Sequence, residues 1–238
     1  MPKGTLYLYP MTLGSEGDIN DVIPSNLFEL VKEFRFFAVE NVKTTRRYLR
    51  KIDRTFPIDD CTFFTLNKKT SALELPEILK PLKEGHNLAI ISEAGCAGVA
   101  DPGASLVSLA HKNKIEIRPL VGPSSILLGL MGSGFNGQTF AFHGYVPKER
   151  KKRIAAFKKF ESVARQTGQT QIFMETPFRN NNLIEDLLNE LLDETPLSIA
   201  SDLTLPTQKI RTMQVAEWRK NAYDLNKKPA IFLIGNMM

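Results

Sequence analysis

The amino-acid sequence predicts an α/β protein, and three observations support this class. Segments with the pattern of a buried strand alternate with segments of helical spacing along the chain. Residues 87–92 form an apolar run of the length expected for a strand in a parallel sheet covered on both faces. The chain has 238 residues, of which 42% are hydrophobic and 24% charged, so it is long enough to bury one or two cores. We therefore expect parallel strands joined by crossover helices.

The first half of the chain contains the clearest alternation. Its strand-like segments are short and apolar, whereas its helical segments repeat apolar residues every three or four positions. Because strand and helix alternate, we expect these elements to form one parallel α/β domain. The predicted strands are residues 5–9, 36–39, 87–92 and 115–121, and the predicted helices are residues 23–33, 44–52 and 104–113.

The second half repeats the alternation and predicts a second α/β domain. We place the boundary near Gly122, so that residues 1–121 form the N-terminal domain and residues 122–238 the C-terminal domain. The predicted helices of the second half are residues 125–132, 150–161 and 181–192, and its predicted strands are residues 139–143, 171–174, 197–200 and 230–234.

The composition excludes several classes of protein. The longest apolar stretch, residues 126–131, is far shorter than the roughly 20 residues of a membrane-spanning helix, and the first residues lead into no signal-like apolar segment. We therefore expect a cytoplasmic protein. Cys61 and Cys96 have no histidine or cysteine neighbours at metal-ligand spacing, so we expect neither a disulfide framework nor a metal site.

Basic residues gather in two segments. The chain has 31 basic and 26 acidic residues, a formal net charge of +5 that is compatible with an anionic partner. Each segment is either a contact with phosphates or a solvated helix face. The first basic cluster consists of Lys43, Arg46, Arg47, Arg50, Lys51 and Arg54, and the second basic cluster of Lys148, Arg150, Lys151, Lys152, Arg153, Lys158 and Lys159.

The connection between the predicted strand at 87–92 and the predicted helix at 104–113 indicates a ligand site. It spends about ten residues with almost no bulk, although most such connections have two to six. Small residues let the backbone approach a ligand at the carboxyl end of a strand, where α/β sheets bind ligands. Asp101 adds a carboxylate at the rim, just before the next helix.

A second turn, residues 121–125, opens the next predicted helix. The N–H groups of a helix N-terminus and the hydroxyls of Ser124 and Ser125 offer donors to a polar ligand group. By contrast, the G-x-G-x-x-G sequence at 132–137 follows a helix and precedes a strand, the reverse of the order in a dinucleotide-binding fingerprint. We interpret residues 132–137 as an ordinary loop.

Several short motifs, taken in order, resemble those of the tetrapyrrole methylase superfamily of S-adenosylmethionine (SAM)-dependent methyltransferases. The chain is most similar to the branch that methylates a ribose 2′-hydroxyl in small-subunit ribosomal RNA. The resemblance covers nearly the whole chain, and the ordered set makes it specific. The motifs are Pro10-Met11-Thr12-Leu13-Gly14 with Asp18-Ile19, Glu40-Asn41-Val42-Lys43, Ser92-Glu93-Ala94-Gly95 through Asp101-Pro102-Gly103, Gly122-Pro123-Ser124, Gly144-Tyr145-Val146-Pro147, and Glu175-Thr176-Pro177 with Arg179.

The resemblance implies a fold, a cofactor and an assembly. It implies two α/β/α domains with SAM bound in the cleft between them, and a homodimer. Pro10 would border the cofactor pocket on the side of the substrate. The residues at the family's cofactor-binding positions are Gly95, Cys96, Val99, Ser124, Ser125, Met174 and Leu203.

The resemblance also suggests catalytic residues. Glu40, Asp101 and Glu175 are carboxylates on matching loops, and we expect Glu40 and Asp101 to face the methyl acceptor. A ribose hydroxyl is a very weak acid, so a general base that removes its proton contributes about 10² to 10⁴ in rate.

Two alternatives to ribosomal RNA methylation stay open. Charged positions of that branch differ here, since Asn41-Val42-Lys43 replaces Asp-Thr-Arg and residues 201–205 replace Arg-Glu-Leu-Thr-Lys. One alternative is a methyltransferase for a tetrapyrrole or another small molecule, which needs a closed and largely apolar trough. The other is a SAM-binding, RNA-associated protein without turnover, because a fold does not determine a function.

Overall fold

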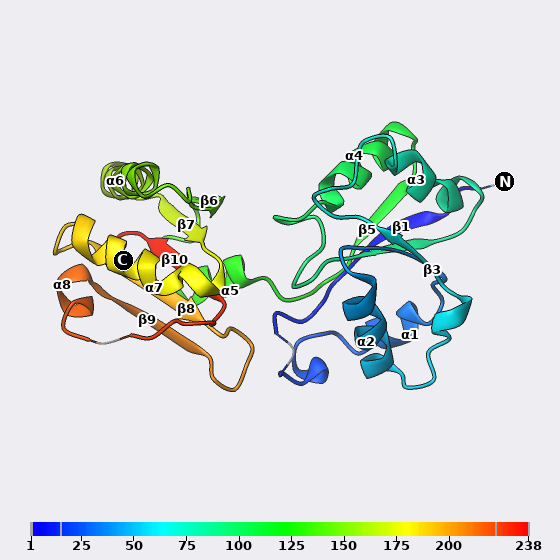
Figure 1. Ribbon diagram of the computed structural model, residues 1–238, viewed down its shortest axis with the longest axis horizontal. Coiled ribbons are helices and arrows are strands. Elements are labelled where there is room, and N and C mark those ends of the chain that lie inside the picture. Colours follow the sequence, from blue (N-terminus) through cyan, green and yellow to red (C-terminus); the bar gives the residue numbers. More distant parts are fainter. Residues whose placement is uncertain (1, 15, 222, 238) are drawn as a thin grey trace. The chain divides into compact units, whose positions relative to one another are not determined.

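The computed structural model describes residues 2–14, 16–221 and 223–237. The chain folds as two compact units, a first unit that ends at Ser124 and a second unit that begins at Ser125 (Figure 1). Within the described ranges, no helix is long and apolar enough to cross a membrane, and no group of three or more potential ligand side chains is placed to hold a metal ion. Cys61 and Cys96 are free thiols.

The first unit contains a five-stranded sheet in which every neighbouring pair of strands is parallel. This confirms the parallel sheet predicted for the first half of the chain. The strand order is β3-β2-β4-β1-β5, so all five carboxyl ends lie at one edge of the sheet. The strands are β1 (Thr5–Tyr9), β2 (Phe36–Val39), β3 (Thr62–Thr65), β4 (Leu88–Ile91) and β5 (Glu116–Pro119).

Helices cover both faces of this sheet, as Figure 1 shows. Alternate side chains of β1 point to opposite faces, so Tyr7 and Tyr9 join one core and Leu6 joins the other. The helices α1 (Asn26–Val31) and α2 (Val42–Ile52) pack on the tyrosine side, and α3 (Leu75–Lys83) and α4 (Gly103–Lys112) pack on the leucine side.

The second unit contains a mixed five-stranded sheet of order β6-β7-β10-β8-β9. Only β6 and β7 pair in parallel, and the other neighbours are antiparallel. Because β10 runs opposite to both β7 and β8, the carboxyl ends of β7 and β8 lie at the same edge. The strands are β6 (Phe140–Tyr145), β7 (Thr170–Met174), β8 (Pro196–Ser201), β9 (Lys209–Gln214) and β10 (Ala230–Ile234).

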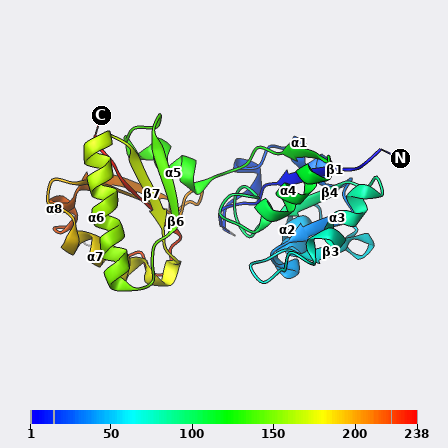
Figure 2. The ribbon, with the colours of Figure 1, turned by 90° about the horizontal axis from the view of Figure 1, so that it is seen from above.

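Helices also cover both faces of the second sheet. The long helix α6 (Arg150–Thr167) packs with α7 (Asn180–Glu190) and the short α8 (Val215–Trp218) against one face, and Figure 2 shows α6 beside β7. Helix α5 (Ser125–Ser133) packs against β8, β9 and β10, and Gly129 lets it approach Ile231 closely. Residues 134–139 then connect α5 to β6 as a loop. The predicted loop at 132–137 is therefore confirmed for residues 134–137, whereas Gly132 and Ser133 still belong to α5.

The sequence patterns missed β3 and α3 in the first unit and β9 and α8 in the second. The strands β3 and β9 lie at sheet edges and leave many side chains exposed, so they lack a clear apolar pattern. Helix α3 contains two prolines, at positions 76 and 81, which argue against a helix at the level of sequence. Helix α8 has only four residues. Helix α1 is also shorter than the predicted segment 23–33.

Candidate functional site

Three loops converge at the carboxyl edge of the first sheet, where β4, β1 and β5 lie side by side. The loop after β1 pairs with the loop after β4, because Met11 N–H donates to the Gly95 carbonyl at 2.9 Å and Gly95 N–H donates back to Met11 at 3.1 Å. The thiol of Cys96 donates to the Pro123 carbonyl at 3.4 Å, in the turn after β5. The structure therefore brings Gly95 and Cys96 together with the predicted second turn.

Gly122, in the turn after β5, packs closely against Pro10 in the loop after β1. A Cβ atom at this position would lie 2.1 Å from Cβ of Pro10, so only glycine fits here without a shift of the backbone or of the proline ring. Pro10 is buried, and its carbonyl accepts a hydrogen bond from the Tyr48 hydroxyl at 3.1 Å. Pro10 and the predicted 121–125 turn are thus in direct contact, and their positions are mutually dependent.

Replacing Gly122 with alanine tests this contact. We expect Gly122→Ala to destabilise the chain by about 2 kcal/mol, because overpacking a closely packed position typically costs 1–3 kcal/mol. Thermal unfolding followed by circular dichroism measures the effect. Gly137→Ala is the matched control, since nothing lies within 4 Å of a Cβ at that position. Equal stability of the two variants would show that Pro10 moves aside freely.

The side chain of Asp101 stabilises the conformation of the loop after β4 through two hydrogen bonds. One carboxylate oxygen accepts the N–H group of Gly98 at 2.8 Å and the other accepts that of Gly103 at 2.7 Å. Gly95, Gly98 and Ala100 have φ angles of +71°, +85° and +62°, a region that favours glycine. The Asp101 carboxylate therefore stabilises a bent loop whose small residues expose the backbone.

A pocket of about 680 Å³ lies beside this loop and within the first unit. Its lining includes the predicted cofactor residues Cys96 and Val99, together with Val107 and His111 of α4 and Leu120 after β5. Val99 is about half exposed at the mouth. The volume lies in the range of small-molecule sites, and the lining is mostly apolar.

Three carboxylates gather where β2 and β4 end. Glu40 follows β2, and its side chain accepts the N–H group of Glu93 at 3.4 Å. Burial raises the pKa of Glu40; the Glu93 N–H opposes this, and the charges of Asp101 and Glu93 raise it further. Burial also raises the pKa of Asp101, although the N–H groups of its loop oppose the shift. The predicted catalytic pair thus lies close enough for the two charges to interact.

Glu93 belongs to this group, although the sequence patterns did not mark it as catalytic. Burial raises the pKa of its side chain, and a hydrogen bond from Thr44 opposes the rise. The sequence feature that could have identified Glu93 is its position just beyond a buried strand, because ligands bind at the carboxyl ends of strands in α/β sheets.

The predicted site residues of the second unit lie at one edge of its sheet. Met174 ends β7 and is half-buried, and Leu203 is buried two residues beyond the end of β8. The loop after β8 is bent, since Asp202 and Thr204 have φ angles of +51° and +69°. Residues other than glycine with positive φ angles are strained, and such residues concentrate at functional sites. Ser125 is the first residue of α5.

Glu175, the carboxylate that follows Met174, is engaged inside the protein. Its side chain is buried and forms an ion pair with Arg179, and it also accepts the N–H group of Thr176 at 2.6 Å. This pairing leaves Glu175 as a support for the loop after β7.

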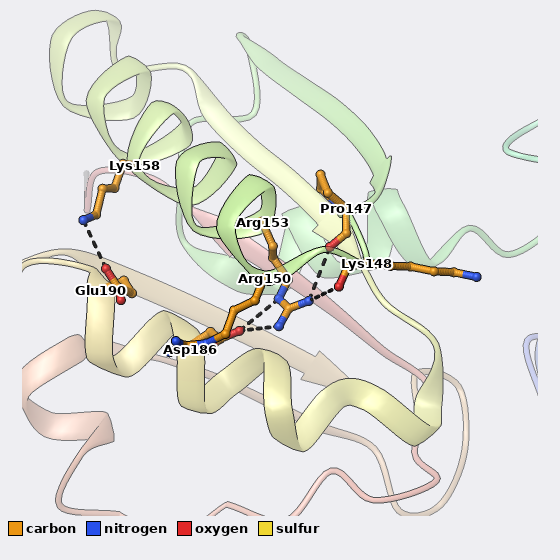
Figure 3. Close-up of polar contacts among 7 residues, drawn as sticks. All are labelled: Pro147, Lys148, Arg150, Arg153, Lys158, Asp186 and Glu190. Carbon is orange, nitrogen blue, oxygen red and sulfur yellow. Dashed lines mark hydrogen bonds and ion pairs between the residues drawn. The ribbon is translucent and has the colours of Figure 1, made fainter.

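Among the described residues, acidic residues of α7 pair with three of the seven residues of the second basic cluster (Figure 3). Asp186 accepts hydrogen bonds from Arg150 at 2.8 Å and from Arg153 at 3.0 Å. Arg153 donates in addition to the carbonyl oxygen of Lys148 at 2.9 Å, so it ties the start of α6 to α7. Further ion pairs join Lys158 to Glu190 and Lys152 to Glu149.

Comparison with known proteins places these features in a family. A family model described as tetrapyrrole (corrin/porphyrin) methylases matches residues 30–218. The fold is similar to that in a crystal structure of the methyltransferase CobJ, with a TM-score of 0.64 and 17% identity over 98% of this chain and 94% of that chain.

Curated relatives carry the name ribosomal RNA small subunit methyltransferase I. The protein of that name from Micromonospora olivasterospora is 30% identical over 202 residues, which are 85% of this chain and 60% of the relative. The one from Halalkalibacterium halodurans is 30% identical over 85% of this chain and 65% of its own length. The one from Escherichia coli O157:H7 is 27% identical over 98% and 78%. The chain thus spans less than two thirds of the length of the first two relatives. With the family model matched over most of its length, the chain belongs to the tetrapyrrole methylase family.

Proposed function

We propose that the protein is a SAM-dependent methyltransferase that acts on a ribose 2′-hydroxyl of small-subunit ribosomal RNA. The observation that carries the proposal is the convergence of the loops after β1, β4 and β5 beside a group of carboxylates. Membership of a methylase family supports the reaction type, and the name of the curated relatives supports the substrate.

The residues present fit the cofactor. The bent loop around Gly95 exposes backbone to a polar ligand, and the neighbouring pocket offers an apolar wall. When bound, SAM supplies a methyl group that its sulfonium already activates. We propose that Pro10, Gly95, Cys96, Val99 and Ser124 of the first unit hold it.

The chain then has to orient the acceptor and remove its proton. Both oxygens of Asp101 are engaged by N–H groups of its own loop, which supports a positioning role. Glu40 accepts a long hydrogen bond from the Glu93 N–H group at 3.4 Å, and a carboxylate has room for several such bonds, so it retains acceptor capacity. We therefore propose that Glu40 accepts the proton of the ribose hydroxyl while Asp101 maintains the loop that meets the cofactor.

Transfer of labelled methyl groups tests the function. We expect transfer from SAM to small ribosomal subunits or their RNA, together with heat of SAM binding in calorimetry. Transfer to a tetrapyrrole acceptor alone would replace the RNA substrate with a small molecule. Binding of SAM without transfer to either acceptor would identify a non-catalytic RNA-associated protein, and absence of SAM binding would contradict the whole assignment.

We also propose that the protein is cytoplasmic and that it works as a homodimer, the assembly that its resemblance to the family implies. Sedimentation velocity at micromolar concentration measures the assembly directly. A sedimenting species of one chain, near 26.8 kDa, would contradict the dimer.

A further inference from the structure

Four residues of the first basic cluster lie on one face of helix α2. With 3.6 residues per turn, Lys43, Arg46, Arg47 and Arg50 fall within about 100° of the helix circumference. All four are exposed. The opposite side of the helix packs into the core through residues such as Tyr48. We call the exposed side the basic face of α2.

Most charges of this face have no acidic partner. Arg46 forms an ion pair with Asp59 at 3.2 Å, and Asp59 is itself highly exposed. The side chains of Arg50 and Lys51 donate to backbone carbonyl groups and form no ion pair with a described residue, although the charges of Asp53 and Asp18 lie within their electrostatic range. Across the described ranges, the structure shows no side-chain partner for Lys43, Arg47 and Arg54.

A larger share of the second basic cluster is paired with carboxylates. Its two arginines converge on Asp186, and Lys158 is paired with Glu190 (Figure 3). A carboxylate already engaged by two arginines reduces the potential that this surface offers to an anion. Figure 3 shows the Lys148 side chain extending away from these pairs. Within the described part of the chain, the lysines of this cluster without an ion pair are Lys148, Lys151 and Lys159.

The basic face of α2 begins at the candidate catalytic site. Asn41 caps the helix, because its side-chain oxygen accepts the N–H groups of Lys43 at 2.9 Å and Thr44 at 3.3 Å. Glu40 is the residue before this cap. From Lys43, the face runs for about 10 Å along the helix to Arg50 at a rise of 1.5 Å per residue. A polyanion bound along α2 therefore reaches the group of carboxylates at its end.

We propose that the basic face of α2 binds the phosphate backbone of the RNA substrate and leads the strand to Glu40. The second basic cluster instead holds α6 against α7. This inference rests on the proposed RNA methyltransferase function and assigns its substrate contact to one of two basic segments. Contacts with phosphates orient a strand without reading its sequence, so α2 contributes affinity and register.

Two triple variants with the same change of charge test the assignment. The α2 variant combines Lys43→Gln, Arg47→Gln and Arg50→Gln, and the matched α6 control combines Lys148→Gln, Lys151→Gln and Lys159→Gln. All six side chains lack an ion pair in the described structure, so both variants are expected to fold. Binding of purified small-subunit ribosomal RNA is measured over a series of salt concentrations, with SAM binding measured by calorimetry.

We expect the α2 variant to lose at least about tenfold in RNA affinity near 0.1 M salt. The slope of log affinity against log salt should become less steep by about 2, because each of the three lost phosphate contacts contributes about 0.7 for a single strand. The α6 control should change affinity by less than about twofold, and both variants should bind SAM as the unmodified chain does.

Three outcomes would overturn the inference. A larger loss in the α6 control, or equal losses in both variants, would remove the special role of α2 while leaving the proposed function intact. Binding of the unmodified chain to vesicles of anionic phospholipid but not to RNA, lost in the α2 variant, would assign the basic face to a membrane surface. Failure of the unmodified chain to bind RNA would overturn the inference and the RNA substrate together.

Discussion

We expect the Glu40→Gln variant to transfer methyl groups about 10²-fold more slowly than the unmodified protein. Glutamine keeps the shape of the side chain but cannot accept a proton, and loss of a general base typically costs 10² to 10⁴ in rate. Glu40 is half-buried next to Glu93 and within the electrostatic reach of Asp101. The neutral glutamine side chain adds no charge to this position. Single-turnover transfer to small ribosomal subunits measures the effect.

Glu93→Gln is the matched control for Glu40→Gln, because it removes a neighbouring carboxylate of similar environment. Its backbone N–H, which contacts Glu40, stays in place. We expect Glu93→Gln to change the rate by less than about threefold, and both variants to bind SAM normally. A slow Glu93→Gln variant combined with a fast Glu40→Gln variant would transfer the role of base to Glu93.

The rate should also depend on pH in a defined direction. Burial, followed by the charges of Asp101 and Glu93, raises the pKa of Glu40 above the ordinary value of a glutamate. A carboxylate accepts a proton only when ionised, so kcat/KM should rise as pH increases through this raised pKa and then level off. The Glu40→Gln variant should lose that rise, and a rise that persists would belong to another group.

The Asp186→Ala variant should lower the free energy of unfolding of the second unit by about 3 kcal/mol. The Asp186 side chain is only 6% exposed, and its removal leaves Arg153, 12% exposed, without a carboxylate. Breaking a buried ion pair from one side costs about 3–5 kcal/mol, and Arg153 keeps its bond to the Lys148 carbonyl, which favours the lower end. Trp218, the only tryptophan, is buried in this unit, so its fluorescence reports the transition.

Glu190→Ala provides the comparison for Asp186→Ala on the same helix. Its pair with Lys158 is largely exposed on the lysine side, and such pairs contribute about 0–1 kcal/mol. We expect the Trp218 transition of this variant to stay within about 1 kcal/mol of the unmodified protein. An Asp186→Ala variant of equal stability would show that α6 and α7 are held by their apolar contacts alone.

Acid should remove the contribution of Asp186. Burial by itself raises the pKa of this carboxyl, but the hydrogen bonds and charges of Arg153 and Arg150 outweigh it and hold the pKa below the usual value. A group with a lowered pKa stabilises the fold above its unfolded-state pKa, and this stabilisation disappears as pH falls through the folded-state value. The difference between the unmodified protein and Asp186→Ala should therefore be full near neutral pH and vanish in strong acid.

The sequence alone determined the class of the fold and the position of the bent small-residue loop after β4. Apolar periodicity and β-branched runs are local properties, so the predicted segments at 5–9, 36–39 and 230–234 coincide with β1, β2 and β10. The small residues around Gly95 also act locally, because a bent backbone with positive φ depends mainly on the residues that adopt it.

Only the tertiary structure decided the strand orders, the contact between Pro10 and Gly122, and which residues of the two basic clusters form ion pairs. The two clusters look alike in sequence, yet the acidic partner of Arg153 lies 33 positions further along the chain. Whether a charge is neutralised depends on which side chains folding brings within a few ångströms, and no local pattern contains that distance. The strands β3 and β9 were not predicted because their side chains are largely exposed or half-buried and form no apolar run, so pairing with neighbouring strands defines them.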